Sequence, residues 1–277
     1  MKADLHIHTT ASDGYFTPEE IIKKAKDKGL KAISITDHDT VEGLERGFQE
    51  AEALHNIIVI PGIEISTNFD DTELHVLGYY IDFNNSKFKK KLHELRQERE
   101  ERNERIIAKL NKLGIKISMD DVRKVVKEGT MGRPHIAQAI CNLGVVGNPQ
   151  KAFDKYLLKG SPAYVSRKKL RPCEAIDLIK EAQGLPVLAH PIFLRDKLQI
   201  LKALKMGFVG VEVEYPAHSS EFKLWLQDKA DRLNLIATGG SDYHGEYKGD
   251  EIGECTVDIT IVQKLQWLKG EECREIF

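Results

Sequence analysis

The sequence lacks the features that mark a membrane, secreted or cysteine-stabilised protein. No apolar run approaches the ~20 residues that a membrane-spanning helix needs. The N-terminus shows none of the basic, apolar and small-residue regions of a signal peptide. The four cysteines are widely spaced without a Cys-x-x-Cys pair, which indicates neither a zinc knuckle nor a redox motif. We therefore expect a cytoplasmic protein with no membrane partner and no evident obligatory protein partner.

The composition suits one barrel-sized unit or a core that carries an insertion. The chain has 277 residues, of which 41% are hydrophobic and 30% charged, so it can bury a sizeable core. Its net charge of −2 conceals an asymmetry. Residues 84–164 contain 18 Lys and Arg against 9 Asp and Glu, whereas the rest of the chain contains 23 against 34. This difference indicates two parts with different roles.

Strand-like and helix-like segments alternate in the first and last parts of the chain. The opening strand carries His6 and His8, and the pattern predicts later strands at residues 31–36, 57–60, 74–81, 185–189, 208–214 and 235–238. It predicts helices at residues 17–28, 40–54, 172–183, 195–206 and 219–233. Such alternation is typical of a parallel α/β sheet or barrel whose functional residues gather at the strand ends.

The middle of the chain is predicted to be almost entirely helical. A long charged helix should span residues 87–113, and shorter helices should begin at Met119, Pro134 and Pro149. Arg99 and Arg102 interrupt the apolar stripe of the long helix, which favours a helical hairpin with a solvated middle. We expect a helical insertion domain at residues 84–164 in a barrel made of residues 1–83 and 165–277.

Histidines and carboxylates recur near the ends of the predicted strands. His6 and His8 project from one face of a strand, although a His-x-His pair alone is a weak signal. The full set contains six of the ten histidines and is His6, His8, Asp13, His38, Glu64, His75, His190, Asp242 and His244. A mixed imidazole and carboxylate set without cysteine favours Mn²⁺, Zn²⁺ or Fe, and nine candidates exceed the needs of one ion. Two or three clustered metal ions are therefore expected.

The same segments resemble the polymerase-and-histidinol-phosphatase (PHP) superfamily of metal-dependent phosphoesterases. The matching motifs are Asp4-Leu5-His6-Ile7-His8, Ser12-Asp13-Gly14, Thr36-Asp37-His38-Asp39, Gly62-Ile63-Glu64, Leu74-His75, Ala189-His190-Pro191 and Ser241-Asp242-Tyr243-His244. The resemblance implies a distorted (β/α)7 barrel with a trinuclear site, for which manganese is favoured. It also implies that all nine residues are ligands, with Glu64 as a bridge and Asp37 orienting the ligands.

Within that superfamily, the long insertion resembles that of small phosphatases acting on nucleoside 3′,5′-bisphosphates, some of which also trim short RNA from its 5′ end. The local matches are Gly132-Arg133-Pro134-His135 and Tyr164-Val165-Ser166-Arg167-Lys168. The resemblance makes Arg133, His135, Ser166 and Lys168 candidate phosphate and sugar contacts. The run Arg167-Lys168-Lys169 departs from the family pattern and leaves open which cation holds the phosphate.

The expected chemistry is hydrolysis of a phosphomonoester without a covalent intermediate. Clustered metals lower the pKa of a bound water and polarise the phosphoryl oxygens. No Ser or Cys nucleophile with an adjacent base is evident, so attack by a metal-bound hydroxide is preferred. The catalytic candidates are His6, His8, Glu64 and Asp242, and His218 is a candidate proton donor to the leaving group.

Alternatives remain open at this point. Arg133 could make a surface ion pair, His135 could face solvent, His218 could merely neighbour a helix start, and the run at residues 167–171 could be a solvated face. A histidinol phosphatase of the same superfamily is the alternative enzyme. A non-catalytic nucleic-acid-binding module is the alternative of another class, but such a module has no need of nine metal-ligating side chains.

Overall fold

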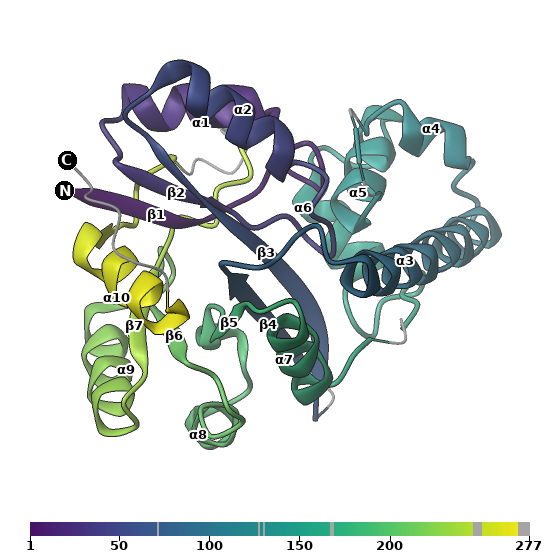
Figure 1. The fold of residues 1–277 in the computed structure, drawn as a ribbon. Helices are drawn as coiled ribbons and strands as arrows, with labels where there is room; N and C mark the ends of the chain where they lie inside the picture. The colour runs from purple at the N-terminus through teal and green to yellow at the C-terminus, as the bar shows by residue number, and fades with distance from the viewer. Residues whose placement is uncertain (71, 127, 130, 167–168, 246–250, 271–277) are drawn as a thin grey trace.

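The computed structural model describes residues 1–70, 72–126, 128–129, 131–166, 169–245 and 251–270. Eight strands form one sheet in the order β7-β6-β5-β4-β3-β2-β1-β8, and the sheet curls into a nearly closed barrel (Figure 1). The strands are β1 (Lys2–Ile7), β2 (Ala32–Ile35), β3 (Ile58–Phe69), β4 (Thr72–Tyr79), β5 (Leu185–Leu188), β6 (Gly210–Glu214), β7 (Ile236–Gly239) and β8 (Val257–Asp258). The predicted α/β barrel is thus confirmed, with the two-residue strand β8 added at its edge.

The helices are α1 (Pro18–Asp27), α2 (Leu44–Leu54), α3 (Ser86–Lys112), α4 (Met119–Arg123), α5 (Arg133–Asn142), α6 (Pro149–Ala152), α7 (Pro172–Glu181), α8 (Lys197–Ala203), α9 (Ser220–Arg232) and α10 (Ile259–Lys269). Those up to α9 follow the predicted order, and α10 is an addition. The predicted start of α2 at Thr40 is wrong. The Thr40 hydroxyl accepts from the Glu42 N–H at 3.3 Å and so supports a turn ahead of the helix.

The sheet is not parallel throughout. Strands β1, β2 and β3 are parallel to one another, as are β5, β6 and β7, but β4 is antiparallel to both of its neighbours. Strand β3 does not end at Ile60 but continues through Pro61 and Gly62 to Phe69. A Pro-Gly pair usually indicates a turn. Here Gly62 is needed for close packing, because a Cβ there would lie 2.3 Å from Ser34 Oγ.

Two hydrophobic clusters stabilise the barrel. The larger one fills the space between the strands and the helices around them, with Ile22 of α1, Ile179 of α7 and Leu226 of α9 among its members. The other joins Leu5 of β1 and Val187 of β5 to α10. Strand β8 and helix α10, which the sequence pattern did not predict, lie against the start of β1, where Asp258 pairs with Lys2. The end of β1 that carries His6 and precedes His8 therefore lies away from α10.

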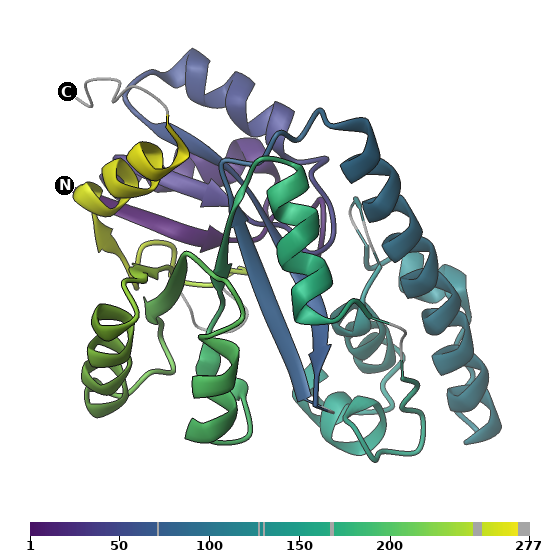
Figure 2. The same cartoon turned by 60° about the horizontal axis from the view of Figure 1, so that its bottom comes forward.

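Residues 84–164, here called the helical insert, have a hydrophobic cluster of their own. Its buried members lie between Ile106 and Ala163, whereas the first turns of α3 pack against the barrel cluster. Figure 2 shows the insert to one side of the long β3 and β4 strands. The predicted solvated middle of α3 is wrong. Arg102 donates from Nε to the Val165 carbonyl at 2.8 Å, and buried Asn103 donates to the Met131 carbonyl at 2.9 Å.

None of the helices in the described part of the chain combines the length and apolar character that crossing a membrane requires.

Candidate metal centre

The first strand delivers two buried imidazoles to one point. His6 lies in β1 and His8 follows its end, and both side chains are fully buried. Their ring centroids are 5.2 Å apart. The His8 N–H donates to the Tyr243 carbonyl at 3.0 Å, which joins the end of β1 to the segment after β7. The two-residue spacing of a strand therefore places both imidazoles on the same side, as the sequence predicted.

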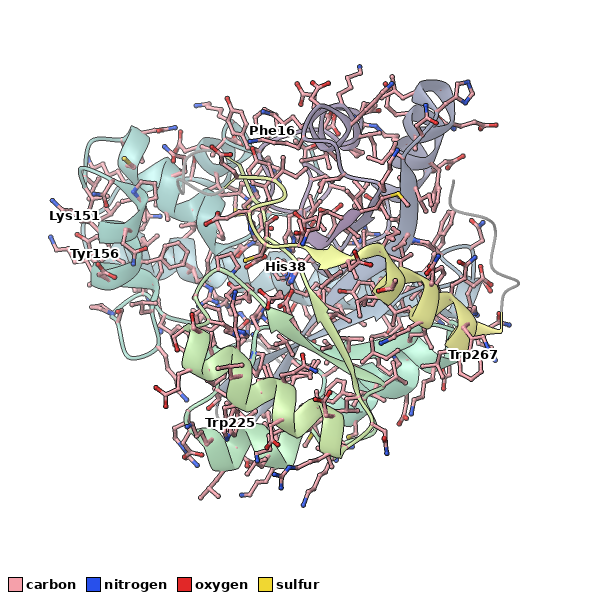
Figure 3. All side chains as sticks on the ribbon, turned by 90° about the vertical axis from the view of Figure 1, so that its left-hand side faces the viewer. Phe16, His38, Lys151, Tyr156, Trp225 and Trp267 are labelled. Atoms are coloured by element: carbon pink, nitrogen blue, oxygen red, sulfur yellow. The ribbon has the colours of Figure 1, made fainter. Side chains whose placement is uncertain are left out.

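The nine predicted ligands come together in space. Eight of them form three overlapping groups, and within each group the possible ligand atoms lie within 4.8 Å of one another. The first group is His8, Asp13, His38 and His244. The second is His6, His8, Glu64 and Asp242, and the third is His38, Glu64 and His75. The ninth, His190, places Nε2 at 2.9 Å from Glu64 Oε1. Figure 3 shows labelled His38 inside the molecule, whereas Trp225 and Trp267 lie toward its periphery.

The side chains of these groups leave unsatisfied atoms that a cation would satisfy. Buried atoms without a hydrogen-bond partner include His6 Nε2, both ring nitrogens of His8, Asp13 Oδ1, His38 Nδ1 and Asp242 Oδ1. Leaving such an atom unpaired costs about 1–3 kcal/mol. Divalent cations bind imidazole nitrogens and carboxylate oxygens, so the residues present fit a metal site. Because His8, His38 and Glu64 each belong to two groups, the three groups form one continuous cluster.

Opposite charges shift the pKa values of these groups. Burial alone would lower the pKa of His8, but the carboxylates of Asp242 and Glu64 raise it to about 9. Burial would raise the pKa of Glu64, but His38, His75 and His6 hold it well below its ordinary value. The centre therefore keeps its carboxylates ionised and attracts positive charge, whether from protons or from metal ions.

Two of these residues do not lie where the sequence pattern placed them. Glu64 lies in the middle of β3, opposite Leu77, and His75 lies in β4, opposite Ser66. They were expected at the carboxyl ends of parallel strands. The other ligands lie at one end of the barrel. Strands β3 and β4, which are antiparallel to each other, extend past that end and so bring Glu64 and His75 to the centre.

Glu212 on β6 was not among the predicted site residues, yet it contacts two of the predicted ligands. Its Oε1 accepts from His6 Nδ1 at 3.0 Å, and its Oε2 accepts from the His190 N–H at 2.8 Å. The side chain is fully buried. A carboxylate behind a ligating histidine fixes the ring and strengthens its metal bond. The signal was present in the sequence, because Glu212 stands between two valines in the strand predicted at residues 208–214.

Two further carboxylates hold the loops that carry the ligands. Asp37 accepts from the N–H and hydroxyl of Thr9, both at 2.7 Å, which supports the implied orienting role of this residue. Asp4 accepts from the N–H of Ser241 at 2.9 Å and from its hydroxyl at 2.6 Å. Burial raises the pKa of Asp4 to about 6. Gly240 allows the two segments to meet, since a Cβ there would lie 2.4 Å from the His6 nitrogen.

The helical insert brings Arg133 to the edge of the centre. Its Nη2 lies 3.3 Å from Oε2 of Glu73 on β4. The Glu73 carboxylate also pairs with Lys169 and lies 3.2 Å from Nε2 of His75. Ser166 is exposed, whereas Arg167 and Lys168 lie outside the described residues. The surface ion pair considered for Arg133 thus exists, but it is made with a residue that contacts the metal centre.

His135 lies two residues after Arg133 at the start of α5, and Arg99 of α3 adds another positive charge to the insert. His135 Nδ1 accepts from the Gly132 N–H at 3.0 Å, so a neutral His135 ring carries its proton on Nε2. Burial lowers the pKa of His135, and the ring is only partly accessible, contrary to a solvent-facing turn residue. Arg99, expected to be solvated, forms an ion pair with fully buried Asp39. The signal for Arg99 was its position within an otherwise apolar helix stripe.

His218 lies close to the centre but outside the three ligand groups. It is buried, and its Nδ1 donates to the Val213 carbonyl at 2.8 Å. Burial lowers its pKa, so the imidazole is neutral at pH 7. Its ring centroid lies 5.2 Å from that of Tyr215, whose hydroxyl donates to Asp242 Oδ2 at 3.0 Å. A neutral ring whose one proton is already donated to a carbonyl is poorly suited to protonate a leaving group.

Comparison with known proteins defines the class to which this fold and site belong. The family model of the PHP domain matches residues 4–157, more than half of the chain, and the chain therefore belongs to the PHP family. It is 31% identical over 275 residues to the 3′,5′-nucleoside bisphosphate phosphatase of Chromobacterium violaceum, covering 97% of this chain and 96% of the relative. It is 31% identical over 256 residues to the 5′-3′ exoribonuclease Rnm of Escherichia coli, covering 90% and 87%.

A solved structure supports the same assignment. A protein of Bifidobacterium adolescentis that is classed as a metal-dependent phosphoesterase matches with a TM-score of 0.89 at 30% identity, covering 98% of this chain and 97% of that one. The chain is thus a metal-dependent hydrolase of phosphoric esters that uses divalent metal. The family resemblance inferred from the sequence motifs is confirmed.

Proposed function

We propose that this protein hydrolyses phosphomonoesters of nucleotides, in particular nucleoside 3′,5′-bisphosphates, and that it also acts on short 5′-phosphorylated RNA. The observation that carries the proposal is the position of Arg133 and His135 beside a nine-residue metal centre. A substrate with two phosphates needs one site for the phosphate that reacts and a second for the one that does not. One relative named above is a 3′,5′-nucleoside bisphosphate phosphatase and the other is a 5′-3′ exoribonuclease, which supports the proposal.

The nine clustered residues are proposed to hold two or three divalent ions, with manganese favoured. The oxygen and nitrogen ligands suit Mn²⁺, and zinc and iron are the alternatives. Bound ions would lower the pKa of a water molecule and polarise the phosphoryl oxygens. His6, His8, Glu64 and Asp242 are the proposed catalytic residues. Their possible ligand atoms lie within 4.8 Å of one another, so together they can hold a cation beside the reacting phosphate.

The insert is proposed to act as a lid over a metal-binding barrel, with residues 1–83 and 165–277 forming the barrel. Ion pairs between Arg96 and Glu42 and between Arg46 and Glu128 fasten residues of the insert to loops and helices of the barrel. Arg133 can hold a phosphate through two parallel hydrogen bonds, and His135 Nε2 can donate a third. Ser166 and Lys168 are retained as further candidate contacts.

Water is proposed to attack phosphorus directly. The serines of two ligand motifs are already engaged, since the Ser12 hydroxyl donates to Asp37 and the Ser241 hydroxyl donates to Asp4, both at 2.6 Å. Hydrolysis in isotopically labelled water should place one label in the released phosphate and invert a chiral phosphorus centre. Retention of configuration would indicate a phosphorylated side chain and contradict this step. Because nucleotides and RNA fragments are cytoplasmic, we place the reaction in the cytoplasm.

Three substrates compared side by side test the proposal. The metal-loaded protein should release phosphate from adenosine 3′,5′-bisphosphate and from short 5′-phosphorylated RNA faster than from histidinol phosphate. Chelation of the metal should stop all three reactions. Faster hydrolysis of histidinol phosphate would establish the alternative enzyme. Binding of RNA without any release of phosphate would establish the non-catalytic module.

A further inference from the structure

An aromatic ring stands exposed at the edge of the metal centre. Phe193 ends the short 3-10 helix η2 (Pro191–Phe193), which directly follows His190. Residues before and after Phe193 in the chain hold the turn in place, because Pro191 is buried and Leu194 packs in the larger barrel cluster. The Phe193 side chain nevertheless remains 58% exposed. Burial of so large an apolar ring would stabilise the fold through the hydrophobic effect, and most of that stabilisation is absent while the ring is exposed to solvent.

Phe193 packs against two side chains that belong to the centre. Its ring centroid lies 5.3 Å from that of His190 and 5.9 Å from that of Tyr215, with edge-to-face geometry in both cases. His190 Nε2 lies 2.9 Å from Glu64 Oε1, and the Tyr215 hydroxyl donates to Asp242 at 3.0 Å. One side chain therefore separates the exposed ring from the carboxylates of the centre.

The cations of the insert lie toward a different neighbour of His190. The His75 ring packs edge to face on His190 with a centroid distance of 5.1 Å. His75 Nε2 in turn contacts Glu73, the partner of Arg133. A nucleotide whose reacting phosphate lies at the centre thus meets positive charge on the side of His75 and an apolar ring on the side of Phe193.

We propose that Phe193 is the stacking platform for the nucleobase of the substrate. This inference rests on the proposed function, and it identifies the residue that holds the base of the substrate. A phenyl ring offers a flat apolar face without donors or acceptors, so it accepts every base and favours purines only through their larger contact area. The protein should therefore discriminate strongly between nucleotides and base-free sugar phosphates, and weakly among the bases.

Tyr15 is the competing platform. It is 50% exposed, and its N–H donates to the His244 carbonyl at 2.7 Å. Its ring packs on Phe16, at a centroid distance of 5.0 Å. Phe193 is favoured because its ring contacts residues of the centre itself. Tyr15→Ala accordingly serves as the comparison variant.

The test compares Phe193→Ala and Phe193→Trp with the wild type, each as the full chain loaded with Mn²⁺. The substrates are adenosine 3′,5′-bisphosphate and ribose 5-phosphate, and adenosine is used as an inhibitor that carries the base without a phosphate. Phe193→Ala should lower kcat/KM for the nucleotide by about fivefold to a hundredfold, the usual effect of removing one stacking ring. The inhibition constant of adenosine should rise by a similar factor, and Phe193→Trp should restore both values. Trp267→Ala, at a 75% exposed ring on α10, is the control and should change neither.

The outcomes separate this inference from the proposed function. An equal loss on both substrates, or unchanged inhibition by adenosine in Phe193→Ala, overturns the platform while leaving nucleotide hydrolysis in place. Loss of base dependence in Tyr15→Ala but not in Phe193→Ala transfers the platform to Tyr15. A metal-loaded wild type that releases phosphate from no nucleotide overturns both proposals.

Discussion

Nη2 of Arg133 in the helical insert lies 3.3 Å from Oε2 of Glu73 on a barrel strand. The same carboxylate lies 3.2 Å from Nε2 of His75 and also pairs with Lys169. The cation that the sequence motif assigns to a substrate phosphate is thus already paired with a protein carboxylate beside the metal centre. A phosphate that enters this position must replace Glu73 as the partner of Arg133.

Removal of the Arg133 side chain should affect one class of substrate more than another. Arg133→Ala should keep its metal and its melting temperature but lose about tenfold to a hundredfold in kcat/KM for a nucleoside bisphosphate, because one charge-assisted contact is worth ~1.5–3 kcal/mol. Hydrolysis of a small generic phosphomonoester should change far less. Arg123→Ala, which removes an exposed arginine paired with Asp120 in the same insert, is the matched control.

The alternatives for Arg133 give different results in the same assay. Equal losses on both substrates would place Arg133 at the reacting phosphate. No loss on either would leave it as a surface ion pair, and loss of metal would contradict the division between a metal-binding barrel and a substrate-binding lid.

The purified protein should bind two or three divalent ions per chain. The six histidines and three carboxylates exceed the roughly four ligands of a single site, and they form three overlapping groups. Metal analysis after dialysis against Mn²⁺ measures the number of ions, and His6→Ala combined with Glu64→Ala should abolish both binding and activity. A single ion under metal-replete conditions would refute the multinuclear centre.

Glu212 should control metal affinity without being a ligand. Glu212→Gln removes the negative charge behind His6 but keeps the size of the side chain, and metal affinity should fall by about tenfold to a hundredfold. Competition with a chelator measures the change. Glu214→Gln is the control on the same strand, because Glu214 is part-exposed and pairs with Lys223. Equal metal affinity in the two variants would show that Glu212 does not support the centre.

The ion pair between α1 and α2 should make stability depend on pH. Arg46 donates to the Glu19 carboxylate at 2.7 and 2.9 Å, which holds the pKa of Glu19 below its ordinary value of 4.5. The folded state then binds fewer protons than the unfolded state, so the stabilisation is present above pH 4.5 and is lost as the pH falls through the folded pKa. Glu19→Gln should lower the free energy of unfolding at neutral pH by ~0.2–1 kcal/mol.

Thermal melts from neutral to acidic pH test this expectation. The difference between Glu19→Gln and the wild type should shrink to zero in acid. Glu45→Gln, an exposed glutamate on α2, should match the wild type throughout. A difference for Glu19→Gln that persists at low pH would mean that the side chain acts through packing and not through its charge.

The sequence by itself determined the features that depend on neighbours along the chain. The alternation of residues put His6 and His8 on one face of a strand, and Thr17 with Glu20 formed the capping box that starts α1. The ligand motifs could be found because each consists of a few adjacent residues beside an apolar strand. The alternation of strands and helices indicated a parallel α/β sheet or barrel, since consecutive elements of this kind pack next to each other, and the resemblance to the PHP superfamily implied the barrel.

Only the tertiary structure decided which distant segments meet. The antiparallel course of β4 follows from the extension of β3 to Phe69, because the two residues left before β4 can join only antiparallel strands, and the residue pattern did not show that extension. The same holds for the contacts of Glu212 with His6 and of Arg99 with Asp39. A charged residue in an apolar segment is compatible with exposure to water or with burial against an opposite charge. The position of that opposite charge, tens to hundreds of residues away in the chain, is set by how the strands and helices pack, which is why folding alone settles the choice.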